Sequence, residues 1–166
     1  MAKFQFKETL DQLAQIVTAR IADGAGESNQ LADADVGKFV KLAGDSQYGL
    51  CAVGNEIEGV LDSLNDGPTQ DGYQLGGVRT NGRVKVTLDG LQATPGTGTI
   101  AIGDYVVAGT VVARGTSLGG AYPKVCKATA AATGIVQKWR VVALYGTGAV
   151  GQIALLGPGR LCRHFD

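Results

Sequence analysis

Residues 73–91 read Tyr-Gln-Leu-Gly-Gly-Val-Arg-Thr-Asn-Gly-Arg-Val-Lys-Val-Thr-Leu-Asp-Gly-Leu, and this stretch decides the fold class. After the Asn81-Gly82 pair, apolar and polar residues alternate strictly, with one apolar face formed by Val84, Val86 and Leu88. A period of two is typical of a half-buried β-strand, and Asn-Gly ahead of such a run indicates a hairpin turn. The stretch therefore predicts a β-hairpin.

The length of the turn follows from keeping that face apolar. A two-residue turn would set Val78 opposite Lys85 and mix the faces. A three-residue turn over residues 80–82 sets Val78 opposite Val84, and Gly82 supplies the left-handed residue that this turn requires. We therefore expect the three-residue turn.

The same register places Arg79 opposite Arg83 on the open face of the hairpin. Like charges directly opposite each other destabilise a strand pair. Two interpretations stay open for this pair: the guanidinium groups splay into water, or they meet acidic groups on the surface of a partner protein.

Length and composition favour one β-rich domain. A chain of 166 residues can bury a core without disulfides, and its 26 glycines are interleaved with Val, Ile, Leu and Thr, which indicates frequent turns. No apolar run approaches the roughly 18 residues of a membrane span, and we expect neither a secretory signal nor a membrane partner. The three scattered cysteines suit a reducing compartment during synthesis better than a disulfide framework.

Charge is balanced overall but unevenly distributed along the chain. Residues 1–104 carry 8 basic and 14 acidic side chains, a net charge of −6, whereas residues 105–166 carry 7 basic and 1 acidic, a net charge of +6. If the two parts separate in space, the opposite potentials suit docking in one orientation or head-to-tail association. The basic part has no cluster of aromatic residues, so we do not expect nucleic acid as a partner.

The two ends of the chain differ from its middle. Phe4 and Phe6 alternate with polar neighbours, which fits either an arm that adds to a sheet edge or a frayed terminus. Apolar residues recur at three- and four-residue spacing over residues 7–21, which predicts one short α-helix. We divide the chain into an N-terminal arm and helix, a β-barrel or sandwich domain, and a C-terminal tail, over residues 1–24, 25–158 and 159–166.

Short strands separated by glycine turns are expected through the middle of the chain. This spacing is typical of an all-β sandwich or barrel, and we predict a small all-β domain of the β-barrel or β-tulip type with the arm and helix added. Besides the hairpin, the expected strands cover residues 35–42, 48–53, 57–64, 99–102, 105–113, 125–128, 135–136, 139–145 and 152–156.

Two motifs match the sequence patterns of known functional sites, but the residues around them do not fit those sites. Residues 115–119 match the Gly-x-Ser-x-Gly nucleophile elbow, but no helix is expected after them, and no acid lies between Asp104 and Asp166 to precede His164. Residues 146–151 match the dinucleotide fingerprint and also lack the helix that it opens. We interpret the second motif as a tight turn between two strands.

Metal sites are not expected either. The cysteines and the single histidine offer one close ligand pair, whereas structural zinc sites combine two. Four acids could meet to bind calcium, but solvation at strand edges is the ordinary explanation for Asp33, Asp35, Glu56 and Glu58. We expect Trp139 to fill a barrel interior. The sequence predicts a protein without catalytic residues, cofactor or metal, hence no enzyme.

The order of several short phrases resembles the head decoration (cement) proteins of tailed bacteriophages, in particular the small glycine-rich group with a β-barrel or β-tulip body. The resemblance covers residues 31–158. The phrases are Val-Gly-Lys-Phe-Val-Lys-Leu at 36–42, Glu-Gly-Val at 58–60, Gly90, Ile-Gly-Asp-Tyr-Val-Val at 102–107, Gly-Ile-Val at 134–136 and Gly-Gln-Ile-Ala-Leu-Leu at 151–156.

The resemblance implies a structural protein that is made in the host cytoplasm and binds the exterior of the virion. Members of that family add to the expanded capsid, often as trimers, and clamp subunits of the major capsid protein. The expected partners are therefore the major capsid protein and further copies of this chain, as a homotrimer or alternatively a dimer. The alternative function is a carbohydrate- or receptor-binding β-module on a virion surface. As contacts to a partner we single out Phe4, Phe6, Arg79 and Arg83.

Overall fold

The computed structural model describes residues 15–22, 31–44, 47–65, 74–129 and 139–158. Within these ranges the regular elements are strands, apart from one 3-10 turn, η1 (Asp33–Asp35). No helix among the described residues is long and apolar enough to cross a membrane. The predicted all-β class is confirmed.

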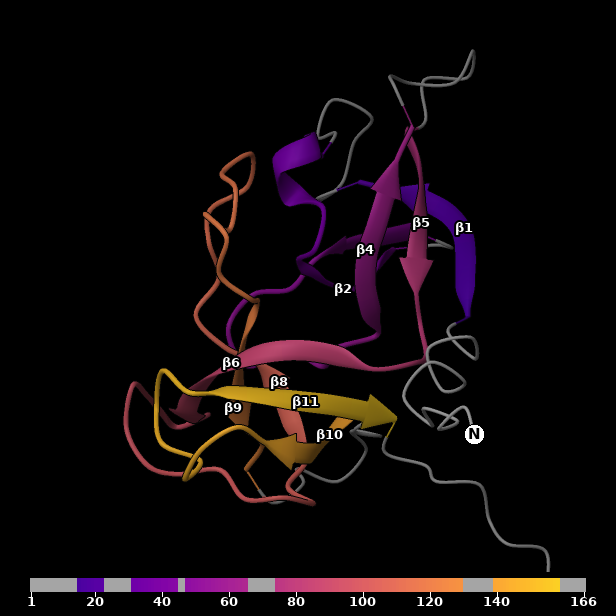
Figure 1. Cartoon of the computed structure of the whole chain (residues 1–166). Helices are drawn as coiled ribbons and strands as arrows, with labels where there is room; N and C mark the ends of the chain where they lie inside the picture. The colour runs from indigo at the N-terminus through magenta and orange to yellow at the C-terminus, as the bar shows by residue number, and fades with distance from the viewer. Residues whose placement is uncertain (1–14, 23–30, 45–46, 66–73, 130–138, 159–166) are drawn as a thin grey trace, which may run out of the picture.

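Five strands from the first half of the chain close into a mixed barrel, in the order β1-β3-β2-β4-β5 (Figure 1). β1 lies parallel to β3, and the other neighbours are antiparallel. Closure pairs both edges of the sheet, so the barrel strands satisfy one another's backbone groups. The strands are β1 (Ile16–Ile21), β2 (Phe39–Gly44), β3 (Gln47–Leu50), β4 (Gly59–Leu64) and β5 (Gln74–Arg79).

The second half of the chain forms an open sheet in the order β10-β11-β6-β9-β8, with the short β7 paired to β6. An isolated bridge joins Tyr105 to Arg140, and the Val141 N–H donates to the Asp104 carbonyl at 3.0 Å. These contacts bring the two ends of the sheet together. The strands are β6 (Val84–Leu91), β7 (Thr94–Pro95), β8 (Val106–Ala108), β9 (Lys124–Lys127), β10 (Trp139–Leu144) and β11 (Ile153–Pro158).

The barrel is stacked on the second sheet, and one core is shared between them (Figure 1). Alternation along β2 and β4 explains how: Val40 and Leu61 belong to the cluster inside the barrel, whereas Phe39 and Val60 join the core of the second sheet. Trp139 is fully buried as expected, but in this shared core and not inside the barrel.

The predicted hairpin is wrong. β5 pairs with β1 and β4 in the barrel, whereas β6 pairs with β7, β9 and β11 in the second sheet. Residues 80–83 therefore carry the chain from one layer to the other. Val78 does not oppose Val84; it lies between Val17 and Leu61.

The alternation on which the hairpin rested is nevertheless confirmed for the strand itself. Gly82 has a φ of +106°, the left-handed conformation expected for it. In β6 the side chain of Lys85 is exposed, while the buried face is formed by Val84, Val86 and Leu88. The sequence thus predicted the local conformation of β6 correctly, but not the strand with which β5 pairs.

The predicted helix over residues 7–21 is wrong where the structure describes it, because Ile16–Ile21 forms β1. Residues 7–14 lie outside the described residues. Two glycines of β5 allow β1 to approach: a Cβ added at Gly76 would lie 2.8 Å from Ile21 Cγ1, and one at Gly77 would lie 3.1 Å from Ile16 Cγ2. Pairing with a distant strand thus overrides the helical spacing of the apolar residues.

The other predicted strands agree with the structure to different degrees. Strands overlap the expected ranges 35–42, 48–53, 57–64, 125–128, 139–145 and 152–156, although the first begins only at Phe39 and Asp35 belongs to η1. Residues 99–102 contribute only the bridge between Thr99 and Ala149, and the strand expected over residues 105–113 is shortened to β8. Residues 135–136 lie outside the described residues.

Candidate functional site

A buried ion pair ties the loop of residues 109–123, here called the pocket loop, to the barrel. Asp35 ends the η1 turn, and its carboxylate Oδ1 accepts from Lys38 Nζ at 2.7 Å and from the Gly115 N–H at 2.8 Å. Lys38 Nζ also donates to the Ala113 carbonyl at 2.7 Å. The Asp35 and Lys38 side chains are 0% and 6% exposed. This ion pair therefore fixes the middle of the pocket loop on the barrel.

The surroundings of Asp35 keep its carboxylate charged. Burial by itself would raise the pKa of this group. The hydrogen bonds from Lys38 and from the backbone N–H groups of Ala32 and Gly115 outweigh burial, so the pKa of Asp35 is lowered from its ordinary value of 3.8. The ion pair therefore stays intact throughout the neutral and mildly acidic range.

We expect a loss of stability in acid that depends on this carboxylate. A pKa lower in the folded than in the unfolded protein stabilises the fold above the unfolded value of 3.8, and this contribution is lost as the pH falls through the folded pKa. The free energy of unfolding of the wild type should therefore decrease below about pH 4 more steeply than that of Asp35→Asn. Urea denaturation between pH 7 and pH 2.5 measures both slopes, and equal slopes would contradict the prediction.

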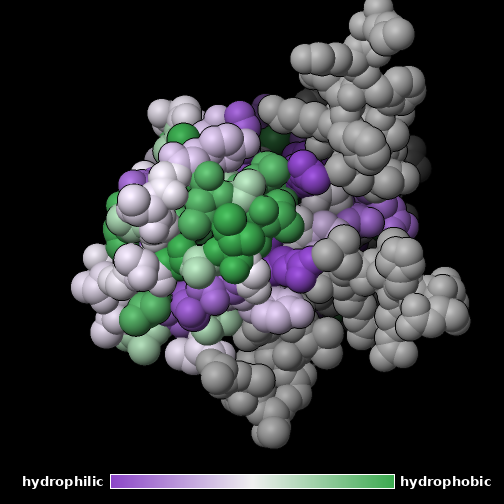
Figure 2. Space-filling view, turned by 60° about the horizontal axis from the view of Figure 1, so that its bottom comes forward, coloured by the Kyte–Doolittle hydropathy of each residue, from purple (hydrophilic) through white to green (hydrophobic). Residues whose placement is uncertain are grey.

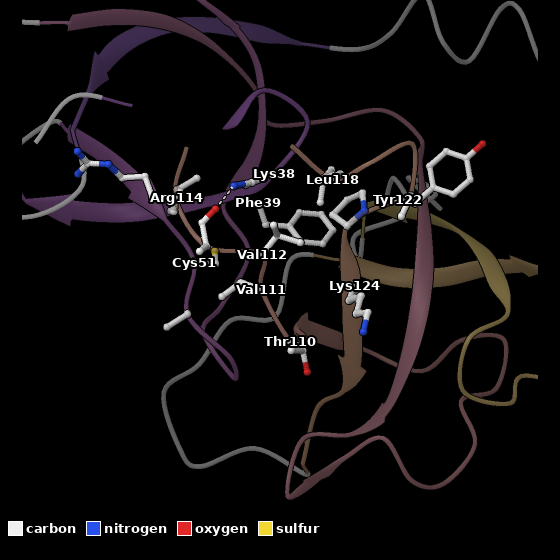
Figure 3. A pocket seen from close by; sticks show the side chains of 15 residues that line it. Lys38, Phe39, Cys51, Thr110, Val111, Val112, Arg114, Leu118, Tyr122 and Lys124 are labelled. Atoms are coloured by element: carbon white, nitrogen blue, oxygen red, sulfur yellow. Dashed lines mark hydrogen bonds between the residues drawn. The ribbon is translucent and has the colours of Figure 1, made fainter. Parts of the chain in front are cut away.

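A pocket of about 260 Å³ lies between the barrel and the pocket loop (Figure 3). Phe39 and Cys51 form its wall on the barrel side. The pocket loop contributes Val111, Val112 and Leu118 from the other side. Apolar side chains thus supply both walls.

Basic side chains stand around this pocket. Lys38, Arg114 and Lys124 are among the residues that line it, and none of the lining residues that the structure describes is acidic. Lys124 Nζ lies 3.7 Å from the carboxylate of Asp89, yet the lysine side chain remains 45% exposed. The Nζ of Lys85 lies 5.9 Å from the ring centroid of Tyr122, another lining residue. The pocket is therefore an apolar cavity with a cationic rim.

The uneven charge along the chain explains this rim, because the two layers follow each other in sequence. The described residues of the barrel carry four basic and five acidic side chains. The described residues 80–129 and 139–158, which form the second sheet and its loops, carry six basic and two acidic side chains. The positive excess of the second half is thus concentrated in one layer.

Neither buried cysteine supplies a nucleophile. Cys51 and Cys126 are free thiols, and burial raises their pKa values to about 12 and about 11. Both thiols therefore stay protonated at neutral pH, and only a thiolate attacks or binds a metal. Within the described ranges, no group of three or more His, Cys, Asp or Glu residues lies close enough to hold a metal ion.

A second surface feature is an apolar patch on the second sheet. Residues 99–105 and 141–153 are held together by the Thr99–Ala149 bridge and by the Ile100 N–H, which donates to the Gly148 carbonyl at 3.0 Å. These two segments carry exposed apolar or aromatic residues, and Ile102 is 64% exposed. Figure 2 shows a continuous hydrophobic area on the face that presents the second sheet. We give the name sheet patch to the exposed large apolar and aromatic residues of these two segments, which are Ile102, Tyr105, Tyr145, Val150 and Ile153.

No family model, no curated protein and no solved structure matches the chain. Function must therefore be argued from the pocket, the sheet patch and the resemblance in sequence.

The four residues proposed as partner contacts do not form one site in the described structure. Phe4 and Phe6 lie outside the described residues. Arg79 forms an ion pair with Asp62, with 3.2 Å between Nη2 and Oδ1, and Arg83 lies half-buried in the link between the layers. The two arginines do not oppose each other across a strand pair. That they meet a partner protein stays a prediction.

The two glycine motifs are loops in the structure. Ser117 lies in the pocket loop, where its Oγ accepts from the Gly119 N–H at 3.3 Å, and no helix follows within the described residues. Residues 146–151 belong to the loop that joins the antiparallel strands β10 and β11, so the motif does connect two strands, but the loop is longer than the tight turn predicted there. Gln152 Oε1 accepts from the Gly148 N–H at 2.9 Å and stabilises this loop.

Sequence reasoning missed both the ion pair and the pocket. Asp35 and Lys38 stand three residues apart, a spacing that a turn can close, but nothing local indicates that they bind residues 113–115. Val111 and Val112 were interpreted as part of a strand, whereas they line a pocket. The pocket forms only when segments about 75 residues apart in the chain meet.

Proposed function

We propose that this protein is a structural protein that binds the exterior of a phage head and stabilises the lattice of the major capsid protein. The observation that supports this proposal most is the sheet patch. Large contiguous apolar areas on a soluble protein mark surfaces that bind other proteins. The resemblance in sequence supplies the kind of partner, and a closed barrel supported by a second sheet supplies a rigid body.

The proposal gives each part of the fold a task. The sheet patch would lie against the capsid lattice, and the barrel would project from it. Several copies joined as a trimer would add their separate contacts, so the interface of each protomer can be modest while the assembly binds tightly. A protein with this task needs shape and stability, which the shared core provides.

The test is binding to expanded heads of the phage that encodes the chain, measured by cosedimentation, after light scattering has given the oligomeric state. We expect a small oligomer that saturates a fixed number of lattice sites. Ile102→Asp places a charge in the sheet patch and should weaken binding at least about tenfold, since a buried unpaired charge disfavours an interface. Leu42→Asp is the matched control, because Leu42 is exposed on the barrel away from the sheet patch.

Two outcomes would contradict the proposal. Wild-type protein that does not bind the heads at micromolar concentration would exclude the decoration function. Equal loss of binding in Ile102→Asp and Leu42→Asp would exclude the sheet patch as the contact.

One observation favours the carbohydrate- or receptor-binding alternative. Tyr105, Tyr122 and Tyr145 are exposed, and exposed aromatic rings are surfaces on which sugar rings stack. Glycan-array binding that is lost in Tyr145→Ala, without binding to the heads, would support this alternative in place of the first.

A further inference from the structure

The size of the pocket fits one anchoring side chain better than a cofactor. Sites for cofactors and small molecules usually have volumes of roughly 300–1,000 Å³. The pocket has about 260 Å³ and apolar walls, to which Phe39, Val112 and Leu118 contribute (Figure 3). Protein interfaces place their strongest contacts in such desolvated apolar pockets, where one aromatic or aliphatic side chain of the partner is buried.

The charges at the rim of the pocket determine which residues of the partner are favourable next to the anchoring side chain. Arg114 and Lys124 line the pocket, and Lys85 Nζ lies 5.9 Å from the ring centroid of the lining residue Tyr122. The two acids with described bonds to this region are buried and already bonded: Asp35 to Lys38 and Gly115, and Asp89 to the Thr110 N–H at 2.7 Å. A partner with carboxylates next to its anchor would gain from this potential, and a basic partner would be repelled.

The rim is continuous with the sheet patch. Across the sheet, Thr87 pairs with Lys124 on one side and with Ile153 on the other. Directly paired residues point to the same face of a sheet, so Lys124 at the rim and Ile153 in the sheet patch lie on one face, about 10 Å apart at two strand spacings. A protein segment of a few residues, at about 3.3 Å per extended residue, can therefore cover both.

We propose that the pocket receives an apolar anchor side chain, flanked by acidic residues, from a segment of the partner protein. This inference rests on the proposed function, in which the partner is the capsid lattice. The anchor fills the space between the barrel and the pocket loop, and its neighbouring carboxylates meet Arg114 and Lys124. The same segment continues over Thr87 towards the sheet patch.

Two blocked pentapeptides test the chemistry without any capsid. Both have a central phenylalanine, which is flanked by four glutamates in one peptide and by four lysines in the other. Titration is followed by the methyl NMR signals of Val111, Val112 and Leu118 in the full-length chain. We expect the glutamate peptide to shift these signals and to bind about tenfold more tightly than the lysine peptide, since each exposed ion pair contributes about two- to fivefold. Equal affinities, or no shift of these methyl signals, would overturn the proposal.

Matched variants locate the binding site. Ala52→Trp fills the pocket from its exposed rim and should weaken binding of the glutamate peptide at least about tenfold, whereas Ala93→Trp, at an exposed turn outside the pocket, should not. Lys124→Gln should weaken binding about threefold. Lys127→Gln removes a lysine of the same strand with similar exposure, 41% against 45%, and should leave binding unchanged. Unchanged binding in both Ala52→Trp and Lys124→Gln would place the peptide elsewhere and overturn the assignment.

Capsid binding of the same variants separates this inference from the proposed function. If the wild type binds heads and Ala52→Trp binds them equally well, the pocket proposal fails and the decoration function stands. If the wild type binds the glutamate peptide in the pocket but no heads, the decoration function fails and the preference for an acidic anchor segment stands.

Discussion

Asp35→Ala is expected to lower the free energy of unfolding by about 3–5 kcal/mol, the usual cost of leaving one charge of a buried pair without its partner. Lys38 would keep its bond to the Ala113 carbonyl but lose the carboxylate, at a site where its side chain is 6% exposed. The Gly115 N–H would lose its acceptor as well. Urea denaturation at pH 7 measures the change.

Asp62→Ala is the control for this prediction, because it removes a more exposed ion pair of the barrel, the one between Arg79 and Asp62. Arg79 and Asp62 are 30% and 33% exposed, and pairs in such positions contribute less than about 1 kcal/mol. Comparable destabilisation by the two substitutions would show that the Asp35–Lys38 pair has no special role. Hydrogen exchange of residues 110–116 adds a local measure, since only Asp35→Ala should accelerate it.

Features set by neighbouring residues could be predicted from the sequence, whereas features set by residues far apart in the chain could not. The alternation in β6 and the left-handed Gly82 are local features, and both were predicted correctly. The pairing of β5 is not local. An Asn-Gly turn allows the chain to fold back, but it allows a crossing between layers equally well, and the choice depends on strands elsewhere in the chain.

The helix prediction failed for a related reason. Residues 16–21 carry apolar side chains at a spacing that suits a helix, and the strand they form buries only Ile21 among them. What makes the strand is the open slot in the barrel between β3 and β5, where Gly76 and Gly77 leave room for it. The sequence of residues 16–21 by itself gives no indication of this space between β3 and β5.

The candidate site could not be predicted for the same reason, because it is formed by segments that are far apart in the sequence. Each of its walls is an ordinary apolar segment in the sequence, and the pocket exists because Asp35 and Lys38 hold the pocket loop against the barrel. The cationic rim, by contrast, was foreshadowed by the positive excess of residues 105–166. An uneven charge along the sequence becomes an uneven charge in space when the two parts of the chain form separate layers, as they do here.

Gly90 lies in β6 opposite Pro95 of β7, and Gly90→Ala should provide the other large effect. Gly90 has a φ of +85°, and a Cβ there would overlap the carbonyl oxygen of Thr97, which the Leu91 N–H uses as its acceptor at 2.9 Å. The left-handed backbone costs a residue with a Cβ about 1–2 kcal/mol, and overpacking adds about 1–3 kcal/mol. We therefore expect a loss of about 2–5 kcal/mol in the free energy of unfolding, measured by urea denaturation.

Gly96→Ala separates the two causes, because Gly96 lies in the turn that follows β7, with a φ of +86°, and has no atom within 4 Å of an added Cβ. It should cost only the backbone strain, about 1–2 kcal/mol. Gly90 follows Asp89, whose carboxylate holds the Thr110 N–H and Lys124 at the pocket rim, so Gly90→Ala should also weaken binding of the glutamate peptide, and Gly96→Ala should not. If both substitutions cost the same, crowding at Thr97 does not contribute, and the fold tolerates a side chain at Gly90 as easily as at Gly96.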